Sequence, residues 1–133
     1  MTQPAITPVL PDAAAAHTLR VLVVDDDTDA AESLAFCLQL DGRLVHYVTS
    51  AEDALALAET FAPHVALIDL FMPRVDGHAL AAELRKRFGR EIVVVAVTGA
   101  LKTVELDAFD FHLMKPIDIR QLDELLAGQL RSG

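Results

Sequence analysis

Five short apolar runs alternate with stretches of helical periodicity, and this alternation constrains the fold of the 133-residue sequence more than any other feature. The runs are continuous rather than alternating apolar and polar, which is typical of strands buried on both faces. They are Leu19–Val24, Leu44–Val48, Val65–Ile68, Ile92–Val97 and Phe111–Met114. Strands and helices that alternate across short loops form βαβ units, which predicts an α/β fold with a parallel sheet and helices on both faces.

The helical stretches begin after short polar side chains that are able to accept hydrogen bonds from the first backbone N–H groups of a helix. We expect these N-cap residues to be Thr28 or Asp29, Ser50, Asp76 and Asp118. Between the fourth and fifth strands, residues 101–109 have room for two helical turns at most. This predicts a shortened or missing helix in that connection.

The first residues of the chain differ from the rest. Pro4, Pro8 and Pro11 precede an alanine run, and prolines at this density favour an extended chain over a helix. We therefore predict a flexible N-terminal tail over residues 1–18 and one domain over residues 19–131. The single cysteine, Cys37, lies in an Ala/Leu-rich helical pattern, where a small buried thiol is the ordinary interpretation.

Charge narrows the range of partners. The formal net charge is −9, which disfavours direct binding to nucleic acid or to an anionic membrane surface and favours basic docking surfaces on other proteins. No stretch approaches the roughly 18 apolar residues of a membrane span. The N-terminus also lacks the basic and apolar regions of a secretory signal, so we expect a cytoplasmic protein.

Polar side chains follow the apolar runs at the points where the strands end. Asp25-Asp26-Asp27 follow the first run, Asp69 follows the third, Thr98 follows the fourth and Lys115-Pro116 follow the fifth. In a parallel sheet the carboxyl ends of the strands share one edge, which is where α/β proteins bind their ligands. The sequence therefore predicts several carboxylates, a hydroxyl and an ammonium group in one crevice.

Carboxylates crowded in this way need a compensating cation. At ~4 Å and an effective dielectric constant near 20, each pair repels by about 4 kcal/mol. Oxygen ligands without an accompanying Cys/His set suit Mg²⁺, which also bridges phosphoryl oxygens. Lys115 is suited to pair with a phosphoryl oxygen, and Thr98 to donate a hydrogen bond to another. The crevice is thus suited to phosphoryl transfer, with Asp69 as the nucleophile.

These residues resemble a known family. The segments are Val23–Asp27, Ile68-Asp69-Leu-Phe-Met-Pro73-x-x-Asp76-Gly77, Val97–Ala100 and Met114–Pro116. In this order they are similar to the signature blocks of the CheY-like response-regulator receiver domain of two-component signalling, and the match covers about residues 19–131. The resemblance implies a flavodoxin-like, doubly wound, five-stranded sheet of order 2-1-3-4-5.

The resemblance also implies roles for individual residues. Asp69 would accept a phosphoryl group from a histidine kinase or a histidine phosphotransfer protein. Asp25, Asp26 and Asp69, with the backbone carbonyl of Phe71, would bind Mg²⁺, whereas Asp27 is better explained as a helix cap. Thr98 and Lys115 would contact the phosphoryl group, and Thr98 and His112 would form the switch. Such a protein is a regulatory phosphoacceptor and not an enzyme, and it signals to a downstream protein that the sequence does not name.

The chain departs from the family in its connection from Thr98 to Lys115, which is shorter than in typical receivers. The face formed by the fourth helix, fifth strand and fifth helix, the family's usual output face, is therefore expected to be altered. Apolar Phe71 and Ala100 flank the site where other receivers often carry polar groups that position water, which predicts slow self-dephosphorylation.

Two other functions are compatible with parts of the sequence. A pseudo-receiver would share the fold and act only as a docking module, and the short connection favours it. A phosphatase of the haloacid-dehalogenase type would use Asp25-x-Asp27 as its first motif. That family needs Thr or Val at position 29, which is Asp29, and a later acidic pair that the sequence lacks.

Overall fold

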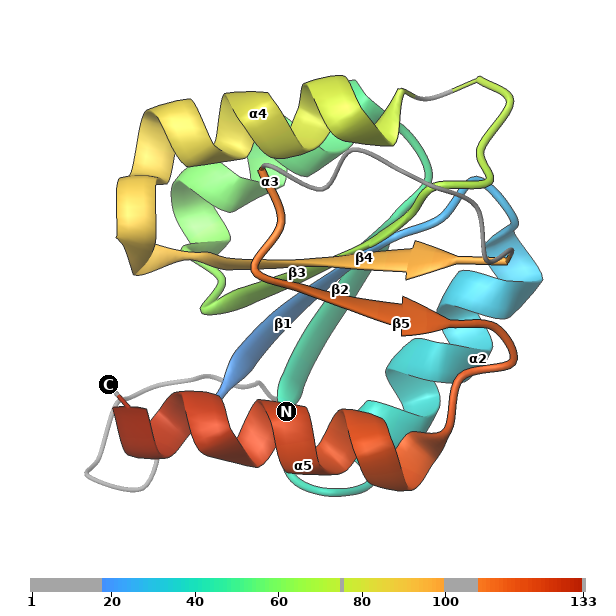
Figure 1. The fold of residues 1–133 in the computed structure, drawn as a ribbon, viewed down its shortest axis with the longest axis vertical. Coiled ribbons are helices and arrows are strands. Elements are labelled where there is room, and N and C mark those ends of the chain that lie inside the picture. The colour runs from blue at the N-terminus through green and yellow to red at the C-terminus, as the bar shows by residue number, and fades with distance from the viewer. Residues whose placement is uncertain (1–17, 75, 100–107, 133) are drawn as a thin grey trace, which may run out of the picture.

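The computed structural model describes residues 18–74, 76–99 and 108–132, and it contains one parallel sheet of strand order β2-β1-β3-β4-β5 (Figure 1). Its strands are β1 (Arg20–Val24), β2 (Leu44–Val48), β3 (Val65–Asp69), β4 (Val93–Thr98) and β5 (Phe111–Met114). The predicted fold class and strand order are confirmed. The predicted tail, the shortened connecting helix and Ala100 lie outside the described residues.

Helices cover both faces of the sheet. The helices are α2 (Thr28–Gln39), α3 (Ala51–Phe61), α4 (Gly77–Phe88) and α5 (Ile119–Ser132), with a short 3₁₀ turn, η1 (Gly89–Glu91), after α4. α2 and α5 lie on one face, and α3 and α4 lie on the other (Figure 1). Within the described residues no helix is both long enough and apolar enough to span a membrane.

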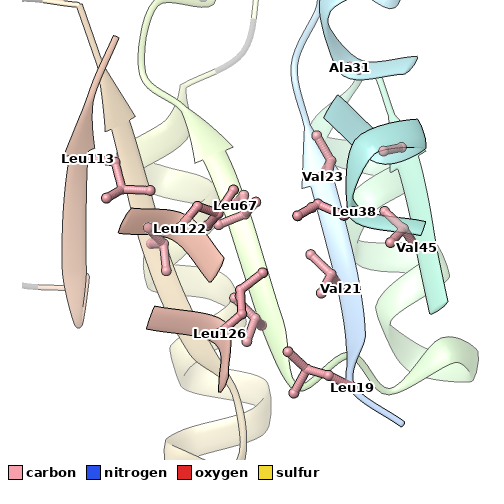
Figure 2. Close-up of a cluster of buried hydrophobic side chains, with 13 residues drawn as sticks. Leu19, Val21, Val23, Ala31, Leu38, Val45, Leu67, Leu113, Leu122 and Leu126 are labelled. Carbon is pink, nitrogen blue, oxygen red and sulfur yellow. The ribbon is translucent and has the colours of Figure 1, made fainter. Parts of the chain in front are cut away.

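The apolar runs are buried on both sides, as predicted. In β1, Val21 and Val23 belong to the core under α2 and α5, whereas Leu22 and Val24 belong to the core under α3 and α4. Successive strand residues point to opposite faces, so a strand covered on both faces must be apolar at every position. Figure 2 shows the first of these cores, in which side chains of α2 and α5 meet those of the strands.

Most of the predicted N-cap residues are confirmed. Ser50 caps α3 by accepting the N–H of Asp53 at 3.1 Å, and Asp76 caps α4. Thr28 and Asp29 do not cap α2, so that expectation is wrong, whereas the interpretation of Asp27 as a helix cap is confirmed, because Asp27 caps this helix. Three polar residues in a row offer equivalent caps, and the position of β1 decides among them.

Cys37 is exposed, so the expectation of a buried thiol is also wrong. The buried residues of α2 are Ala31, Ala35 and Leu38, which follow one another at spacings of four and three. That spacing defines one face of the helix. Cys37 lies between two of these positions in sequence but faces away from the sheet.

Arg85 ties the end of α4 to the strands beside it. Its guanidinium donates to the carboxylate of Asp110 and to the carbonyls of Gly89 (2.6 Å), Ile92 (2.8 Å) and Ala108 (3.3 Å). Asp110 Oδ2 also accepts the N–H of Val94 at 2.8 Å. Both charged side chains are mostly shielded, with 26% and 30% of their surface exposed. The network therefore holds the segment that leads into β5 against α4 and β4.

We expect Arg85→Met to lower the free energy of unfolding by about 2–3 kcal/mol, because the Asp110 carboxylate and the three carbonyls lose a charged donor. Chemical denaturation measures this. The matched control is Arg87→Met on the same helix, where the guanidinium pairs with exposed Glu83 and Glu59, and the loss should be much smaller. Equal losses in the two variants would contradict a special role for Arg85.

His64 accepts a backbone hydrogen bond that requires its neutral form. The N–H of Arg20 donates to His64 Nδ1 at 2.9 Å, at the start of β1. Burial, and then the positive charge of Arg20, lower the pKa of His64. The folded state therefore binds fewer protons here than the unfolded state, whose His pKa is about 6.5.

The contribution of neutral His64 to the free energy of unfolding should be fully present above about pH 6.5. It should be lost as the pH falls through the lower pKa that His64 has in the folded state. We expect the free energy of unfolding of the wild type to fall more steeply between about pH 7 and pH 5 than that of His64→Asn. The asparagine oxygen still accepts the Arg20 N–H but does not titrate in this range. Denaturation at a series of pH values measures the difference, and parallel curves would refute the prediction.

Candidate phosphoacceptor site

Four polar residues lie at the carboxyl ends of neighbouring strands. Asp25 follows β1, Asp69 ends β3, Thr98 ends β4 and Lys115 follows β5. Because β1, β3, β4 and β5 are adjacent and parallel, these ends share one edge of the sheet. Asp25, Asp69 and Thr98 are buried, whereas Lys115 keeps 39% of its side chain exposed.

Asp69 is held by two hydrogen bonds. Its Oδ2 accepts from Lys115 Nζ at 2.8 Å, and its Oδ1 accepts from the N–H of Phe71 at 2.8 Å. Lys115 is itself fixed by its backbone N–H, which donates to the carbonyl of Thr98 at 2.7 Å. Burial disfavours the charge on Lys115, but the hydrogen bond and attraction to Asp69 outweigh it, so the pKa of Lys115 is raised.

For Asp25, burial outweighs the interactions that favour the charged form of its side chain. Burial raises the pKa of Asp25, and the nearby negative charge of Asp69 raises it further. The N–H of Asp27, which donates to Asp25 Oδ1 at 3.0 Å, and the charge of Lys115 lower it only in part. The site thus holds two buried carboxylates against one lysine and keeps an excess of negative charge.

The other predicted site residues make looser contacts. Asp26 is half-buried, and Asp27 accepts the N–H groups of Asp29 and Ala30, which is the role of a helix cap. Among the described residues, the Thr98 hydroxyl makes no hydrogen bond to Asp69 or Lys115.

His112, the expected switch residue, and Phe71 are both exposed. His112 pairs with Ala96 in the sheet and is exposed on β5. Phe71 is 58% exposed, and its ring lies so close to Gly99 that a Cβ there would approach it to 2.8 Å.

The donor set fits a hard divalent cation. Within the described part of the chain, no three acidic, His or Cys side chains converge as a ready-made ligand set. The buried pair Asp25 and Asp69 nevertheless supplies carboxylate oxygens with unbalanced negative charge, and Asp26 adjoins them in sequence. Mg²⁺ commonly takes one or two carboxylates and completes its shell with water and phosphate oxygens.

A cavity of about 560 Å³ extends from the polar residues between α2 and the segment after β5. Its polar lining is Asp25, Asp69 and Lys115, and its other walls are apolar, including Leu34 of α2 and Ile117. The sequence interpretation placed the polar residues but missed these walls. The signal for them was weak, because Leu34 also fits the buried stripe of a helix.

The comparisons agree with this geometry. The family model described as the response regulator receiver domain matches residues 21–127. The chain is 35% identical over 114 residues to the response regulator MprA of Mycolicibacterium vanbaalenii, covering 82% of this chain and 48% of that protein. It is 32% identical over 112 residues to an uncharacterized 14.6 kDa protein of Leptolyngbya boryana, covering 80% and 86%.

A solved structure agrees as well. The CheY-like response regulator receiver domain of Methylobacillus flagellatus superposes with a TM-score of 0.76 at 34% identity, covering 84% of this chain and 98% of that one. Coverage of this breadth extends the likeness well beyond any single motif. With the fold, the polar edge and the family match in agreement, the chain belongs to the response regulator receiver domain family of two-component signalling.

Proposed function

We propose that this chain accepts a phosphoryl group on Asp69 from a histidine kinase or a histidine phosphotransfer protein. The observation that carries the proposal is the environment of Asp69, a 5% exposed carboxylate held between Lys115 Nζ and the Phe71 N–H. The receiver domain is assigned to residues 19–131, and it works by changing its contacts with a downstream protein. The excess negative charge argues against direct binding to nucleic acid or membranes.

In the transfer, a carboxylate oxygen of Asp69 attacks phosphorus while the bond from phosphorus to the donor histidine nitrogen breaks. The nitrogen retains that electron pair, and the product is an acyl phosphate. Lys115 neutralises charge on the phosphoryl oxygens and is already placed against Asp69. Asp25, Asp26, Asp69 and the Phe71 carbonyl would hold Mg²⁺, which would supply further charge neutralisation.

Switching follows from the new charge. Thr98 ends β4 beside Asp69, and its hydroxyl moves to donate a hydrogen bond to a phosphoryl oxygen. His112, in the neighbouring strand β5, then changes its exposure and alters the face formed by β5 and α5. The Arg85–Asp110 ion pair lies just before β5, and the cis Lys115–Pro116 peptide follows it directly.

Incubation with acetyl phosphate and Mg²⁺, followed by intact mass measurement, tests the proposal. We expect a gain of one phosphoryl group that hydroxylamine removes, as is typical of an acyl phosphate. EDTA should prevent the gain if the cation is required. A wild-type protein that gains nothing under these conditions would instead act as a phosphorylation-independent docking module.

Phe71 predicts how long the phosphoryl group lasts. Its ring covers Gly99, and it offers no polar atom to orient water at the acceptor. We expect slow self-dephosphorylation in the wild type and a rate about ten-fold faster in Phe71→Gln, whose amide is able to orient water. Loss of the phosphorylated mass with time measures both rates. A lifetime of seconds in the purified wild type would contradict the prediction.

A further inference from the structure

A separate cavity, of about 430 Å³, lies between α2 and β2, which is the strand at one edge of the sheet. Its lining includes Phe36 and Gln39 of α2 and Val45, His46 and Tyr47 of β2. We call this cavity the β2 groove. Phe36 and Tyr47 contribute aromatic rings to it, whereas the ring of His46 packs edge to face against Phe61 of α3. The Gln39 amide donates to the carbonyl of Val45 at 3.2 Å.

Several large apolar side chains of α2 and β2 are exposed to solvent. Phe36 is 60% exposed and Leu40, one helical turn later, is 70% exposed. Leu44, at the start of β2, is 50% exposed. Phe36 lines the groove and Leu40 follows it one turn later on the same helix, and exposed apolar side chains of this size are typical of a surface that binds another segment.

The groove also contains a hydrogen-bond donor that is only weakly engaged. Within the described residues, the Tyr47 hydroxyl donates to Glu32 Oε2 at a long 3.4 Å. Grooves lined by aromatic rings with such donors bind proline-rich segments in the polyproline II conformation, because that conformation is already extended and its carbonyls face outward. The chemistry of the β2 groove thus favours a proline-rich occupant.

The chain itself contains a segment of this kind. Pro8-Val9-Leu10-Pro11 has prolines at the first and fourth positions with two apolar residues between them. In residues 1–17 the only charged side chain is that of Asp12, so the acidic surface of the domain does not strongly repel this segment. Four residues of polyproline II span about 9 Å, which matches the roughly 10 Å between the first and fourth residues of β2.

The start of the sheet lies close to the groove. The N–H of Leu44 donates to the carbonyl of Leu19 at 3.0 Å, so the chain enters β1 directly beside the first residue of β2. The seven peptide steps from Pro11 to Thr18 reach at most about 25 Å. This tether is ample to cross one strand spacing of about 5 Å and follow the outer edge of β2.

We propose that Pro8–Pro11 of this chain bind in the β2 groove of the same molecule, with their apolar side chains and proline rings against Phe36 and Tyr47. The proposal does not depend on phosphorylation of Asp69. It assigns a role to the prolines of the N-terminal segment and to the aromatic residues of the open edge, neither of which the acceptor site uses.

Tyr47 makes the test specific, since it is the only tyrosine and the chain has no tryptophan. Acrylamide quenching of tyrosine fluorescence is compared between the full wild-type chain and Val9→Asp/Leu10→Asp. We expect Tyr47 to lose its protection from the quencher in that variant. The matched control, Ala14→Asp/Ala15→Asp, adds the same charge outside the proline segment and should keep the protection.

A synthetic peptide of residues 1–13 should then restore protection when it is added to Val9→Asp/Leu10→Asp. Equal quenching in the wild type and that variant, or failure of the peptide to restore protection, would overturn the proposal. The measurement is repeated at several protein concentrations. Protection that increases with concentration would also overturn it, since the occupant would then be the segment of a second copy.

Discussion

Asp69→Asn should abolish the gain of a phosphoryl group from acetyl phosphate and leave the fold intact. The amide that replaces the carboxylate is a poor nucleophile, so the transfer loses its acceptor. The side-chain oxygen of the substituted asparagine still accepts the N–H of Phe71, which donates to Asp69 Oδ1 at 2.8 Å in the wild type. One of two crowded carboxylates disappears, which offsets the loss of the Lys115 ion pair. Intact mass measures the loss, and circular dichroism checks the fold.

Asp76→Asn is the matched control for that variant. Asp76 is exposed and caps α4 by accepting the N–H groups of His78 and Ala79, and asparagine caps a helix about as well. We expect this variant to gain the phosphoryl group at the wild-type level. If Asp69→Asn were still phosphorylated, the acceptor would be another carboxylate, and the assignment of Asp69 would be wrong.

The Asp69→Asn variant also tests the coupling between the two buried aspartates. Because the charge of Asp69 raises the pKa of Asp25, removal of that charge should lower the pKa of Asp25. A carboxyl carbon titration by NMR follows Asp25 in both proteins. An unchanged titration would show that the two groups interact less than their burial implies.

Much of this architecture is predictable from the sequence because strands buried on both faces tolerate only apolar residues. The predicted ranges of β2 and β5 match the structure to the residue, those of β1 and β3 differ by one residue at one end, and that of β4 differs by one residue at each end. Once the sheet is parallel, residues that follow its strands must share an edge. The juxtaposition of Asp25 and Asp69 therefore follows from topology, without any knowledge of side-chain contacts.

Features that depend on packing between distant segments were not predictable in this way. The sequence indicates a lysine at the polar edge, but only the structure shows that it pairs with Asp69 and not with Asp25. The exposure of Cys37 depends on the rotation of α2 about its axis. The bond from Arg85 to Asp110 spans 25 residues, and no local pattern marks either partner.

Lys115→Met should slow phosphorylation of Asp69 by about 10²–10³-fold, the usual effect of removing one preorganised donor from a site where charge develops. The ammonium group lies 2.8 Å from Asp69 Oδ2 and is anchored through the Thr98 carbonyl, so little reorganisation is needed to reach a phosphoryl oxygen. Methionine keeps the unbranched side chain and removes the charge. The rate of mass gain with acetyl phosphate and Mg²⁺ measures the effect.

Two further variants test whether the effect comes from the net charge of the protein or from the shape of the charged group at position 115. Lys86→Met removes a lysine from the last turn of α4, away from the carboxyl edge, and should phosphorylate at the wild-type rate. Lys115→Arg keeps the positive charge but replaces a compact ammonium with a planar fork, so its rate should fall between those of the wild type and Lys115→Met. If Lys115→Met matched the wild-type rate, the ion pair with Asp69 would be structural, and charge neutralisation during transfer would have to come from the bound cation alone.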